Sequence, residues 1–477
     1  MKKFPEYKEL NLNKISKTIS DFWEIDNSFK KSIETRSSKQ RFVFFEGPPS
    51  ANGMPGIHHV MSRTIKDIFC RYKTLKGFLV ERKAGWDTHG LPVELSVEKE
   101  LGITKEEIGK AISIKDYNNA CKKAVMKYTN SWNDLTKRIG YWVDMEDPYI
   151  TYKTKYIESV WWLIKEIYKK KFIYKGYTVQ PYSPMAGTGL SSHELNQPGT
   201  YVDVSDTSIT AQFKIINETL PKQFKDNSDF FFLAWTTTPW TLPSNTALTV
   251  GSKIEYVVIN TFNQYTFNPI KVIIAKKLIE KQFGNKYYIV KNKEELISFN
   301  SEKKIIPYFI ETNIKGKDLI GVKYEKIWKD APDPIDYPEN AYRVIPGDFV
   351  NTDEGTGIVH TAPTFGSDDA KAALEAKPQV PALLILDENN NKVPLVDLKG
   401  KFVKNLGSLS EKYVKSEYYK KSEIPEKSVD VEIAIKLKTE NRAFKVEKYK
   451  HSYPNCWRTD KPILYYPLDS WFIKISE

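Results

Sequence analysis

The sequence is poor in cysteine and has no long apolar run. Its three cysteines, Cys70, Cys121 and Cys456, lie far apart and form no CxxC pair, which argues against a disulfide framework and a thiolate zinc site. No window approaches the roughly 18 consecutive apolar residues that a membrane-spanning helix needs. Residues 1–6 lead into polar sequence without the apolar core of a secretory signal. We therefore expect a cytoplasmic protein that has no contact with a membrane.

The composition is that of a globular protein with an excess of basic residues. The chain has 477 residues, of which 40% are hydrophobic, 28% charged and 13% aromatic, so we expect about three folded domains. The formal charge of +12 indicates a polyanionic partner, although lysine-rich surfaces also serve solubility alone. The lysines are spread along the chain, which predicts a broad docking surface if they bind RNA.

Strand and helix patterns alternate from the start to about residue 180. Residues 41–46 have the pattern of a buried strand, and a glycine-rich turn follows them. Gly77 ends a segment with helical periodicity, Thr104 and Glu107 can form a capping box, and residues 156–168 predict an amphipathic helix with an aromatic core stripe. The apolar positions before Gly77 are Ile65, Ile68, Phe69, Tyr72 and Leu75. This order of elements favours an α/β fold with a doubly wound sheet.

Short β-like runs dominate from about residue 205 to 395. Polar turns such as 388–391 separate them, which is typical of a compact, β-rich and barrel-like domain. The runs are 230–235, 256–259, 271–274 and 382–386. The stretch after 395 returns to a mixed pattern.

A turn of small residues, within 46–59, precedes two adjacent histidines at a predicted helix N-terminus. Small residues let the backbone approach a ligand closely, and a helix N-terminus attracts phosphate. The imidazoles of His58 and His59 could donate hydrogen bonds to phosphate oxygens. The alternative is a tight turn with two surface histidines, because neither GxxxxGK[ST] nor GxGxxG occurs in it.

This turn resembles the signature region of class I aminoacyl-tRNA synthetases, in which a HxGH tetrapeptide after a PPxANG-like turn binds ATP. The tetrapeptide here is Gly-Ile-His-His, so His59 aligns with the last histidine of the motif and Gly56 replaces the first. His58 stands at the third position and could substitute for the missing histidine. The resemblance implies a substrate complex of ATP and Mg²⁺ at Asn52, Gly53, Gly56, His58 and His59.

Residues 85–94 resemble the GWDxHGLPxE segment of the isoleucyl-specific members of this family, and the valyl and leucyl members differ at the His-Gly-Leu-Pro core. An amino-acid substrate carries an ammonium group that needs a carboxylate partner, and the resemblance assigns that role to Asp87. It places His89 and Glu94 in the same site and Pro48 in the wall of an aliphatic pocket. Alternatively, Asp87 caps a helix and His89 packs in a core.

A threonine-rich segment, 235–241, suggests a second site. Threonines usually favour an edge strand, but these lie between two tryptophans and next to prolines, and clustered hydroxyls can hold a ribose, an ester or an attacking water. The segment resembles the threonine motif of the editing domain in isoleucyl, valyl and leucyl synthetases. The residues concerned are Thr236, Thr237, Thr238 and Thr241.

The segment 355–369 resembles the GTG…AP…D partner of that threonine motif. The resemblance implies that Asp369 holds the ammonium of a mischarged amino acid, that His360 lies in the same pocket and that Asn245 is a further pocket residue. No Ser-His-Asp spacing and no metal-ligand spacing is evident, so we expect hydrolysis by an oriented water with help from the tRNA end.

Nothing in the sequence matches the KMSKS-like second signature of the class. We therefore expect the first half of a synthetase, inactive in aminoacylation by itself and able to edit. The resemblance implies tRNA(Ile), isoleucine and ATP as partners of a monomer, with no zinc. The expected division is a Rossmann-like catalytic part over 1–180, a connector over 181–204, an editing domain over 205–395 and a return segment over 396–477.

Two alternatives remain open. One is the valyl homologue, which the His-Gly-Leu-Pro core at 89–92 disfavours. The other is a non-catalytic tRNA-binding module that retains these motifs without using them.

Overall fold

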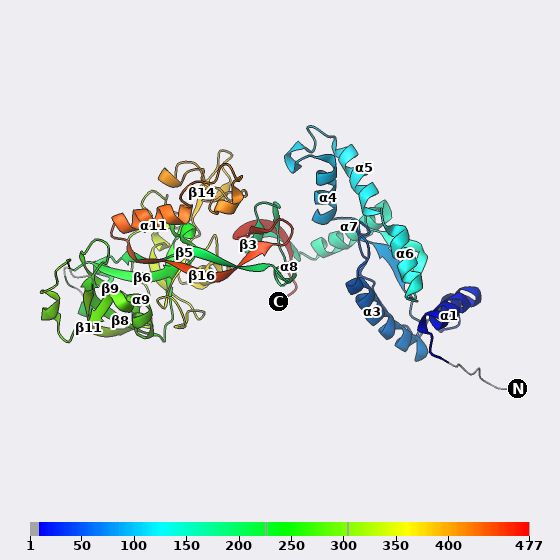
Figure 1. The fold of residues 1–477 in the computed structure, drawn as a ribbon, viewed down its shortest axis with the longest axis horizontal. Helices are drawn as coiled ribbons and strands as arrows, with labels where there is room; N and C mark the ends of the chain where they lie inside the picture. Colours follow the sequence, from blue (N-terminus) through cyan, green and yellow to red (C-terminus); the bar gives the residue numbers. More distant parts are fainter. Residues whose placement is uncertain (1–8, 225, 227, 303–304, 477) are drawn as a thin grey trace. The chain divides into compact units, whose positions relative to one another are not determined.

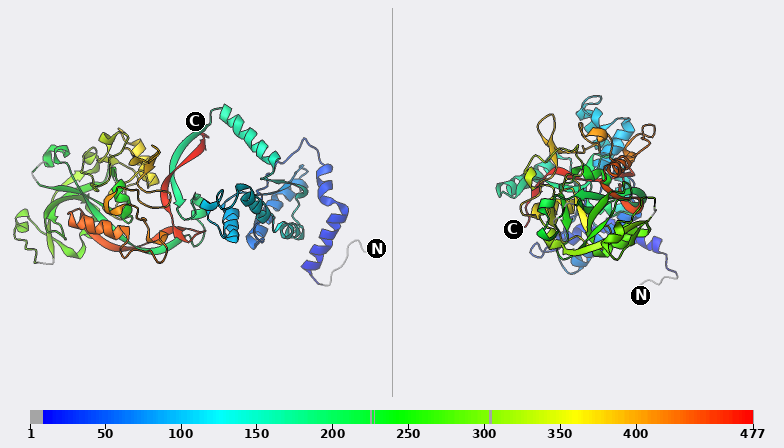
Figure 2. Two further views of the ribbon diagram at one scale, coloured as in Figure 1. Left: turned by 90° about the horizontal axis from the view of Figure 1, so that it is seen from above. Right: turned by 90° about the vertical axis from the view of Figure 1, so that its left-hand side faces the viewer.

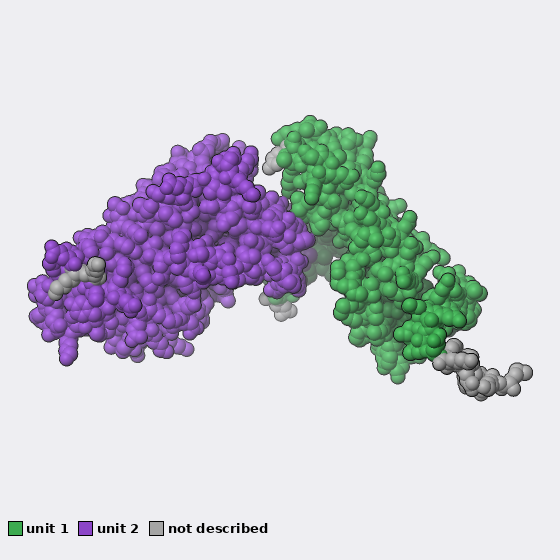
Figure 3. All heavy atoms as spheres, viewed as in Figure 1, with its two compact units in different colours: residues 1–173, 474–477 green, residues 174–473 purple. Residues whose placement is uncertain are grey.

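The computed structural model describes residues 9–224, 226, 228–302 and 305–476. The sequence prediction for residues 1–6 therefore lies outside the described part. The chain forms two compact units, Met1–Ile173 with Lys474–Glu477, and Tyr174–Ile473 (Figure 3). The division predicted from the sequence, with boundaries at 180, 204 and 395, stays a prediction. Within the described residues no helix is both long and apolar enough to span a membrane.

The first unit is mainly helical. Its described strands form one sheet of two parallel strands, β1 (Lys83–Trp86) and β2 (Asp144–Ile150). The helices are α1 (Leu12–Asp26), α2 (Ser28–Glu34), α3 (Ile57–Leu75), α4 (Leu91–Leu101), η1 (Lys105–Glu107), α5 (Ile114–Val125), α6 (Thr129–Arg138) and α7 (Thr154–Lys169) (Figure 1).

Helices α3 and α7 confirm the predicted helical periodicity. Gly77 has φ +92°, a conformation that suits glycine, and the N–H of Phe78 bonds back to the carbonyl of Lys73 to close the end of α3. The capping box of Thr104 and Glu107 also forms, with the Thr104 N–H 2.6 Å from Glu107 Oε2, although it begins the short η1.

The apolar faces of these two helices are not core faces. On α3 the predicted stripe is exposed, and on α7 no residue is buried. The prediction of an aromatic core stripe over 156–168 is therefore wrong, although Tyr156 at its start stacks on Tyr149 of β2 with ring centroids 5.7 Å apart.

The predicted buried strand over 41–46 is also wrong. These residues are exposed or half-buried, and their ladder is a single parallel bridge from Arg41 to Leu79. The segment runs into the turn at Pro49, whose carbonyl accepts the N–H of Asp87 at 3.0 Å. A strand pattern needs a neighbouring strand along its length, and one bridge does not supply it.

The second unit is built on a mixed sheet of eight strands in the order β10-β11-β8-β9-β6-β5-β16-β17 (Figure 1). The pairs β6–β9 and β10–β11 are parallel and the others antiparallel. The strands are β5 (Tyr201–Lys214), β6 (Phe230–Thr236), β8 (Glu255–Phe262), β9 (Pro269–Ala275), β10 (Tyr287–Ile289), β11 (Ile306–Lys315), β16 (Ala443–Cys456) and β17 (Lys461–Pro462). Three of the four predicted β runs, those at 230, 256 and 271, are strands of this sheet.

Smaller elements complete the second unit. A three-stranded sheet has the order β12-β7-β13, and β14 and β15 form a hairpin around the predicted polar turn. A third sheet joins β18, β3 and β4, and Figure 2 shows β3 beside β18. The strands are β3 (Ile173–Ser183), β4 (Thr188–Gly189), β7 (Ala247–Val250), β12 (Arg343–Pro346), β13 (Ile358–Thr361), β14 (Leu384–Leu386), β15 (Lys392–Pro394) and β18 (Leu464–Ile473).

The helices of the second unit are short. The α-helices are α8 (Ser192–Leu195), α9 (Ile279–Phe283), α10 (Ser367–Glu375) and α11 (Val429–Thr439). The 3-10 helices are η2 (Asn217–Thr219), η3 (Lys222–Phe224), η4 (Pro239–Ser244), η5 (Lys276–Leu278), η6 (Gly284–Lys286), η7 (Lys293–Leu296), η8 (Gly316–Leu319), η9 (Pro338–Asn340), η10 (Gly407–Leu409) and η11 (Ser416–Tyr418).

One large apolar cluster forms the core of the second unit. The inner strands β6, β8 and β9 are buried along nearly their whole length, as continuous apolar runs such as 230–234 require. The strands that the structure describes leave the sheet open, so the barrel-like architecture is not found. The α/β character is confirmed, since both units combine helices with strands and both contain parallel strand pairs.

Candidate functional site

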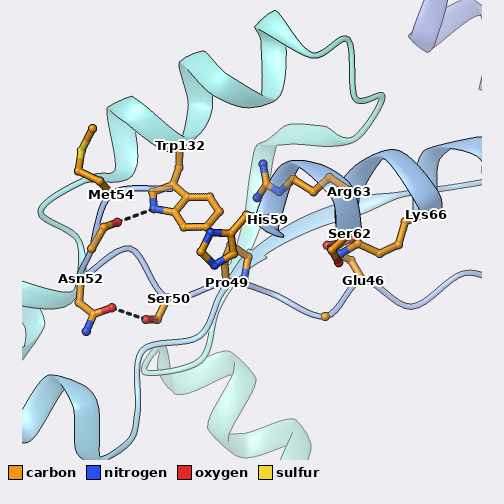
Figure 4. Close-up of a pocket in the computed structure, with 12 residues that line it drawn as sticks. Glu46, Pro49, Ser50, Asn52, Met54, His59, Ser62, Arg63, Lys66 and Trp132 are labelled. Atoms are coloured by element: carbon orange, nitrogen blue, oxygen red, sulfur yellow. Dashed lines mark hydrogen bonds and ion pairs between the residues drawn. The ribbon is translucent and has the colours of Figure 1, made fainter. Parts of the chain in front are cut away.

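The turn after residue 46 and the start of α3 enclose a cavity of about 280 Å³, here called the turn pocket (Figure 4). Of the residues predicted for ATP, Asn52, Gly53 and His59 line it, whereas Gly56 and His58 do not belong to its described lining. The lining is Glu46, Gly47, Pro49, Ser50, Asn52, Gly53, Met54, His59, Ser62, Arg63, Lys66 and Trp132.

His59 is oriented at the first turn of α3. Its Nδ1 accepts the backbone N–H of Gly56 at 2.9 Å, so the neutral ring carries its proton on Nε2. The ring lies edge-on to Trp132, with centroids 4.6 Å apart, and Trp132 donates to the carbonyl of Gly53 at 2.9 Å. Burial lowers the pKa of His59, and His58 and Arg63 add to the effect. The site thus presents a neutral imidazole N–H donor beside a helix N-terminus.

Two cations of the turn pocket were missed by the sequence interpretation. Arg63 is buried and donates to the hydroxyl of Thr136, and Lys66 is paired with Glu46. Burial lowers the pKa of Arg63. Arg63 and Lys66 follow His59 by four and seven residues along α3, which places all three side chains on one helix face. This spacing could have identified the two cations from the sequence.

Of the residues predicted to hold an amino acid, Asp87 and His89 lie in the loop after β1. Asp87 is exposed, and its Oδ1 accepts the N–H of His89 at 3.4 Å. His89 Nδ1 lies 3.1 Å from the hydroxyl of Thr151, which ties the loop to the end of β2. Glu94 is in the first turn of α4, and Pro48 is half-buried in the turn that leads into the pocket. The backbone bond from Asp87 to the Pro49 carbonyl brings the two segments together.

A second cavity, of about 220 Å³, lies between β6, η4 and β13 and is here called the threonine pocket. It brings together residues from two segments that are more than a hundred positions apart in the sequence. The lining is Trp235, Thr236, Thr237, Thr238, Thr241, Val359, His360, Ala362, Phe365 and Asp369. All the predicted threonines, together with His360 and Asp369, therefore line the same cavity.

The threonine segment turns from strand to 3-10 helix within this pocket. Thr236 ends β6, and its hydroxyl oxygen accepts the N–H of Thr238 at 3.0 Å. The hydroxyls of Thr236 and Thr238 are 3.2 Å apart. The two prolines of η4 suit a short 3-10 segment and not a continuing strand, which explains why the edge-strand interpretation fails.

Asn245 lies behind the pocket wall in contact with His360. Its Nδ2 is 2.8 Å from His360 Nδ1, and His360 Nε2 is 3.0 Å from the hydroxyl of Thr241. Burial lowers the pKa of His360 to about 3. The imidazole is therefore neutral at physiological pH, and both its nitrogens are hydrogen-bonded.

Asp369 lies in the first turn of α10, with Oδ2 2.8 Å from the N–H of Ala362. Burial raises the pKa of this carboxyl to about 7, and Asp368 adds to the rise. A carboxylate in a partly dry pocket gains from an ammonium partner, so the arrangement can bind a cationic amine next to a row of hydroxyls.

Two buried residues around the threonine pocket were not predicted. Tyr324 donates to Asn245 Oδ1 at 2.7 Å, and Asp430 at the start of α11 accepts the N–H of Trp240 at 2.9 Å. In the described part of the chain no group of three or more His, Cys, Asp or Glu side chains is placed to hold a metal ion.

Comparison with known proteins gives consistent matches along the chain. The family model described as tRNA synthetases class I (I, L, M and V) matches residues 18–477. An isoleucine–tRNA ligase of Cytophaga hutchinsonii is 57% identical over 98% of this chain, and one of Bacteroides thetaiotaomicron is 52% identical over 99%. The chain spans 42% and 43% of the lengths of these two curated relatives.

The likeness to a solved editing domain is weak. The crystal structure of GlLeuRS-CP1 matches with a TM-score of 0.32 and 15% identity, over 51% of this chain and 100% of that one. A likeness at this level carries no argument about the site.

Proposed function

The chain belongs to the class I tRNA synthetases of the I, L, M and V group, and on that premise we propose that it carries the amino-acid activation and editing sites of an isoleucine–tRNA ligase. The relatives that support isoleucine are 52% to 57% identical over nearly the whole chain. The proposed partners are isoleucine, ATP with Mg²⁺ as the substrate complex, and tRNA(Ile). The proposed protein is a cytoplasmic monomer.

The turn pocket is the proposed ATP site, in a catalytic part with the Rossmann-like doubly wound fold of the class. His59 would donate from Nε2 to phosphate oxygens, and the N-terminus of α3 would add its positive end. Asn52 and Gly53 would let the nucleotide approach the backbone, while Gly56 and His58 flank the motif. Asp87 would hold the ammonium of isoleucine; Pro48, His89 and Glu94 complete the proposed amino-acid site.

The threonine pocket is the proposed editing site. One observation carries this proposal: four threonine hydroxyls, a neutral buried His360 and the carboxyl of Asp369 line the same cavity of about 220 Å³. Asp369 would hold the ammonium of the mischarged amino acid, and the hydroxyls of Thr236, Thr237 and Thr238 would orient the ester and a water for attack.

A separate editing site is needed because a hydrophobic pocket discriminates poorly between isoleucine and valine. Isoleucine and valine differ by one methylene, and a hydrophobic pocket gains only about 1–3 kcal/mol from that group, a range for which isoleucyl enzymes are themselves the standard example. The discrimination between isoleucine and valine that this free energy provides is too small for accurate translation. A small second pocket that admits valine and excludes isoleucine completes the selection.

The deciding experiment is deacylation of valyl-tRNA and isoleucyl-tRNA with the isoleucine anticodon. We expect the chain to hydrolyse the valyl ester selectively, and the Asp369→Ala variant to lose hydrolysis or selectivity. Asp368→Ala is the matched control, because Asp368 is the exposed neighbour of Asp369 in the same helical turn. Valyl-tRNA that survives with the chain as long as in buffer alone would contradict the editing proposal.

The alternative of a non-catalytic tRNA-binding module makes a different prediction. A binder should be indifferent to Asp369→Ala, whereas an editor should not. A valyl homologue would also spare valyl-tRNA in this assay, so selective hydrolysis of the valyl ester that Asp369→Ala abolishes would argue against both alternatives. Because the sequence has no KMSKS-like segment, we also propose that this chain alone catalyses little isoleucine-dependent pyrophosphate exchange.

A further inference from the structure

We propose that Tyr324 is a positioning residue for editing, which fixes the tautomer of His360 through Asn245 and so orients the hydroxyl of Thr241 in the threonine pocket. The inference rests on the proposed editing function and deepens it. Tyr324 lies outside both sequence motifs of the pocket, 79 residues from Asn245, and it does not line the cavity. Its influence on the site would therefore act through the two residues between.

The first step is the orientation of the Asn245 amide. Its Nδ2 lies 2.8 Å from the carbonyl oxygen of Ala247, which can only accept a hydrogen bond. The NH₂ group must therefore face Ala247, and Oδ1 must face the hydroxyl of Tyr324 at 2.7 Å. Without the tyrosine hydroxyl, Oδ1 would be a buried acceptor without its donor, and the amide would lose one of the bonds that define its orientation.

The second step is the tautomer of His360. The same NH₂ group donates to His360 Nδ1 at 2.8 Å, so this nitrogen carries a lone pair and not a proton. The ring proton is then on Nε2, which donates to the hydroxyl oxygen of Thr241 at 3.0 Å. Protonation of Nδ1 would place its N–H against the NH₂ group of Asn245, so that two donors would face each other. This disfavours the charged imidazole, in the same direction as burial, which lowers its pKa.

The third step is the hydroxyl of Thr241. It receives the His360 proton donor on one lone pair and donates its own proton to the carbonyl of Thr238 at 2.8 Å. Its second lone pair is what a bound water or ribose hydroxyl would meet, because Thr241 lines the cavity. The direction of every bond in the series Tyr324–Asn245–His360–Thr241 is thereby set.

This arrangement assigns His360 a different role from that of a general base. Neither ring nitrogen is available to take a proton from water, since Nδ1 accepts from Asn245 and Nε2 is already protonated. The residues of the series are all buried, with Tyr324 only 1% exposed, so solvent does not compete for their bonds. His360 holds Thr241 in place, and the attacking water has to be oriented by the hydroxyls.

The test is the ring ¹⁵N spectrum of the chain with labelled histidine, which has only six histidines to resolve. In the wild-type chain His360 should show the neutral Nε2–H tautomer between about pH 5 and 8, the range in which an ordinary histidine titrates. In Tyr324→Phe the same signal should change to a mixture of tautomers or begin to titrate. The control is Tyr342→Phe, which removes a neighbouring hydroxyl that bonds to Asp333 instead, at 3.1 Å.

Deacylation of valyl-tRNA gives the second readout. Tyr324→Phe should lower the rate by about tenfold, the effect of one lost hydrogen bond, while Tyr342→Phe keeps the wild-type rate. A wild-type His360 that titrates normally, or an unchanged tautomer in a folded Tyr324→Phe variant, would overturn the proposal. The wild-type spectrum can overturn the proposal even if that variant does not fold, and it can do so even if the chain hydrolyses no ester.

Discussion

At the scale of single residues, the threonine pocket displaces two titratable groups in opposite directions. Burial lowers the pKa of His360 to about 3 and raises that of Asp369 to about 7. Both shifts favour the neutral form, as expected where water is excluded. The pocket thus favours neutral side chains, and a cation that enters it would make ionisation of Asp369 more favourable.

The raised pKa of Asp369 predicts a pH-dependent stability difference. The folded state binds this proton more tightly than the unfolded state, so the stabilisation is fully present below about pH 4 and is lost as pH rises through about 7. The wild type loses about 1.4 kcal/mol for each pH unit between the two pKa values, so we expect Asp369→Asn, whose amide cannot ionise, to gain about 2–3 kcal/mol relative to it between pH 5 and 8. Urea unfolding at both pH values measures the difference.

Asp368→Asn is the control for this measurement. Asp368 is exposed and contributes less than burial to the raised pKa of Asp369, so its substitution should change the pH dependence of stability much less than Asp369→Asn does. A pH-independent effect of Asp369→Asn would show that the Asp369 carboxyl is hydrated and that its pKa is ordinary.

At the scale of elements, the shape of the threonine segment depends on a contact with a distant helix. Asp430 at the start of α11 accepts the N–H of Trp240, which lies in η4 directly after the threonines. Burial raises the pKa of this carboxyl to about 7, although Lys415 opposes the rise. The contact anchors η4, because a buried backbone N–H without an acceptor is costly.

We predict that Asp430→Ala destabilises the second unit by about 1–3 kcal/mol, the cost of leaving the Trp240 N–H unsatisfied. Asp430→Asn keeps an acceptor oxygen at the same place and should cost much less. Chemical denaturation of the three proteins provides the comparison. Equal losses of unfolding free energy in the two variants would mean that Asp430 stabilises the unit through its charge and not through the hydrogen bond to Trp240.

The sequence predicted the residues that line the threonine pocket, but not the buried residues that hold them in place. The threonines and His360 with Asp369 belong to two dense local motifs, so their resemblance to a family was enough to bring them together. Tyr324 and Asp430 contact the site across 79 and 190 residues and stand in segments without any motif. Their roles follow from burial and from single hydrogen bonds, which no local pattern encodes.

The fold was predicted in a similar way, element by element. Periodicity indicated α3 and α7 and the buried strands at 230, 256 and 271, because each pattern is local. It did not indicate which faces are covered, since a periodic apolar stripe is the same whether or not a partner packs on it. That is why the stripe of α7 and the strand at 41–46 were assigned to a core they do not enter.

Helix α7 offers a direct test of this difference. Trp161 and Trp162 are 66% and 61% exposed, so replacing either with Gln should change stability by no more than about 0.5 kcal/mol. Trp132 on α6 is 2% exposed, and Trp132→Ala should cost about 3–5 kcal/mol. Chemical denaturation measures the free energy of unfolding of the three variants. A loss of several kcal/mol on replacing Trp161 or Trp162 would show that the apolar face of α7 is part of a core.

At the scale of the whole molecule, the two units differ in how much core they contain. The main apolar cluster, from Tyr182 to Tyr466, lies entirely in the second unit, while a buried cluster of the first consists of Ala51, Trp86 and Trp132. Cores that share no residues give each unit its own cooperative transition. We therefore expect calorimetry of the chain to resolve two unfolding transitions.

Core substitutions assign the two transitions. Leu233 is fully buried in β6, so Leu233→Ala should destabilise only the second unit, by about 2–5 kcal/mol, and leave the other transition in place. Trp132→Ala should do the reverse. Deacylation should follow the second unit, because every residue of the threonine pocket belongs to it. A single transition that both substitutions shift together would mean that the units fold as one, and that the editing site cannot be separated energetically from the turn pocket.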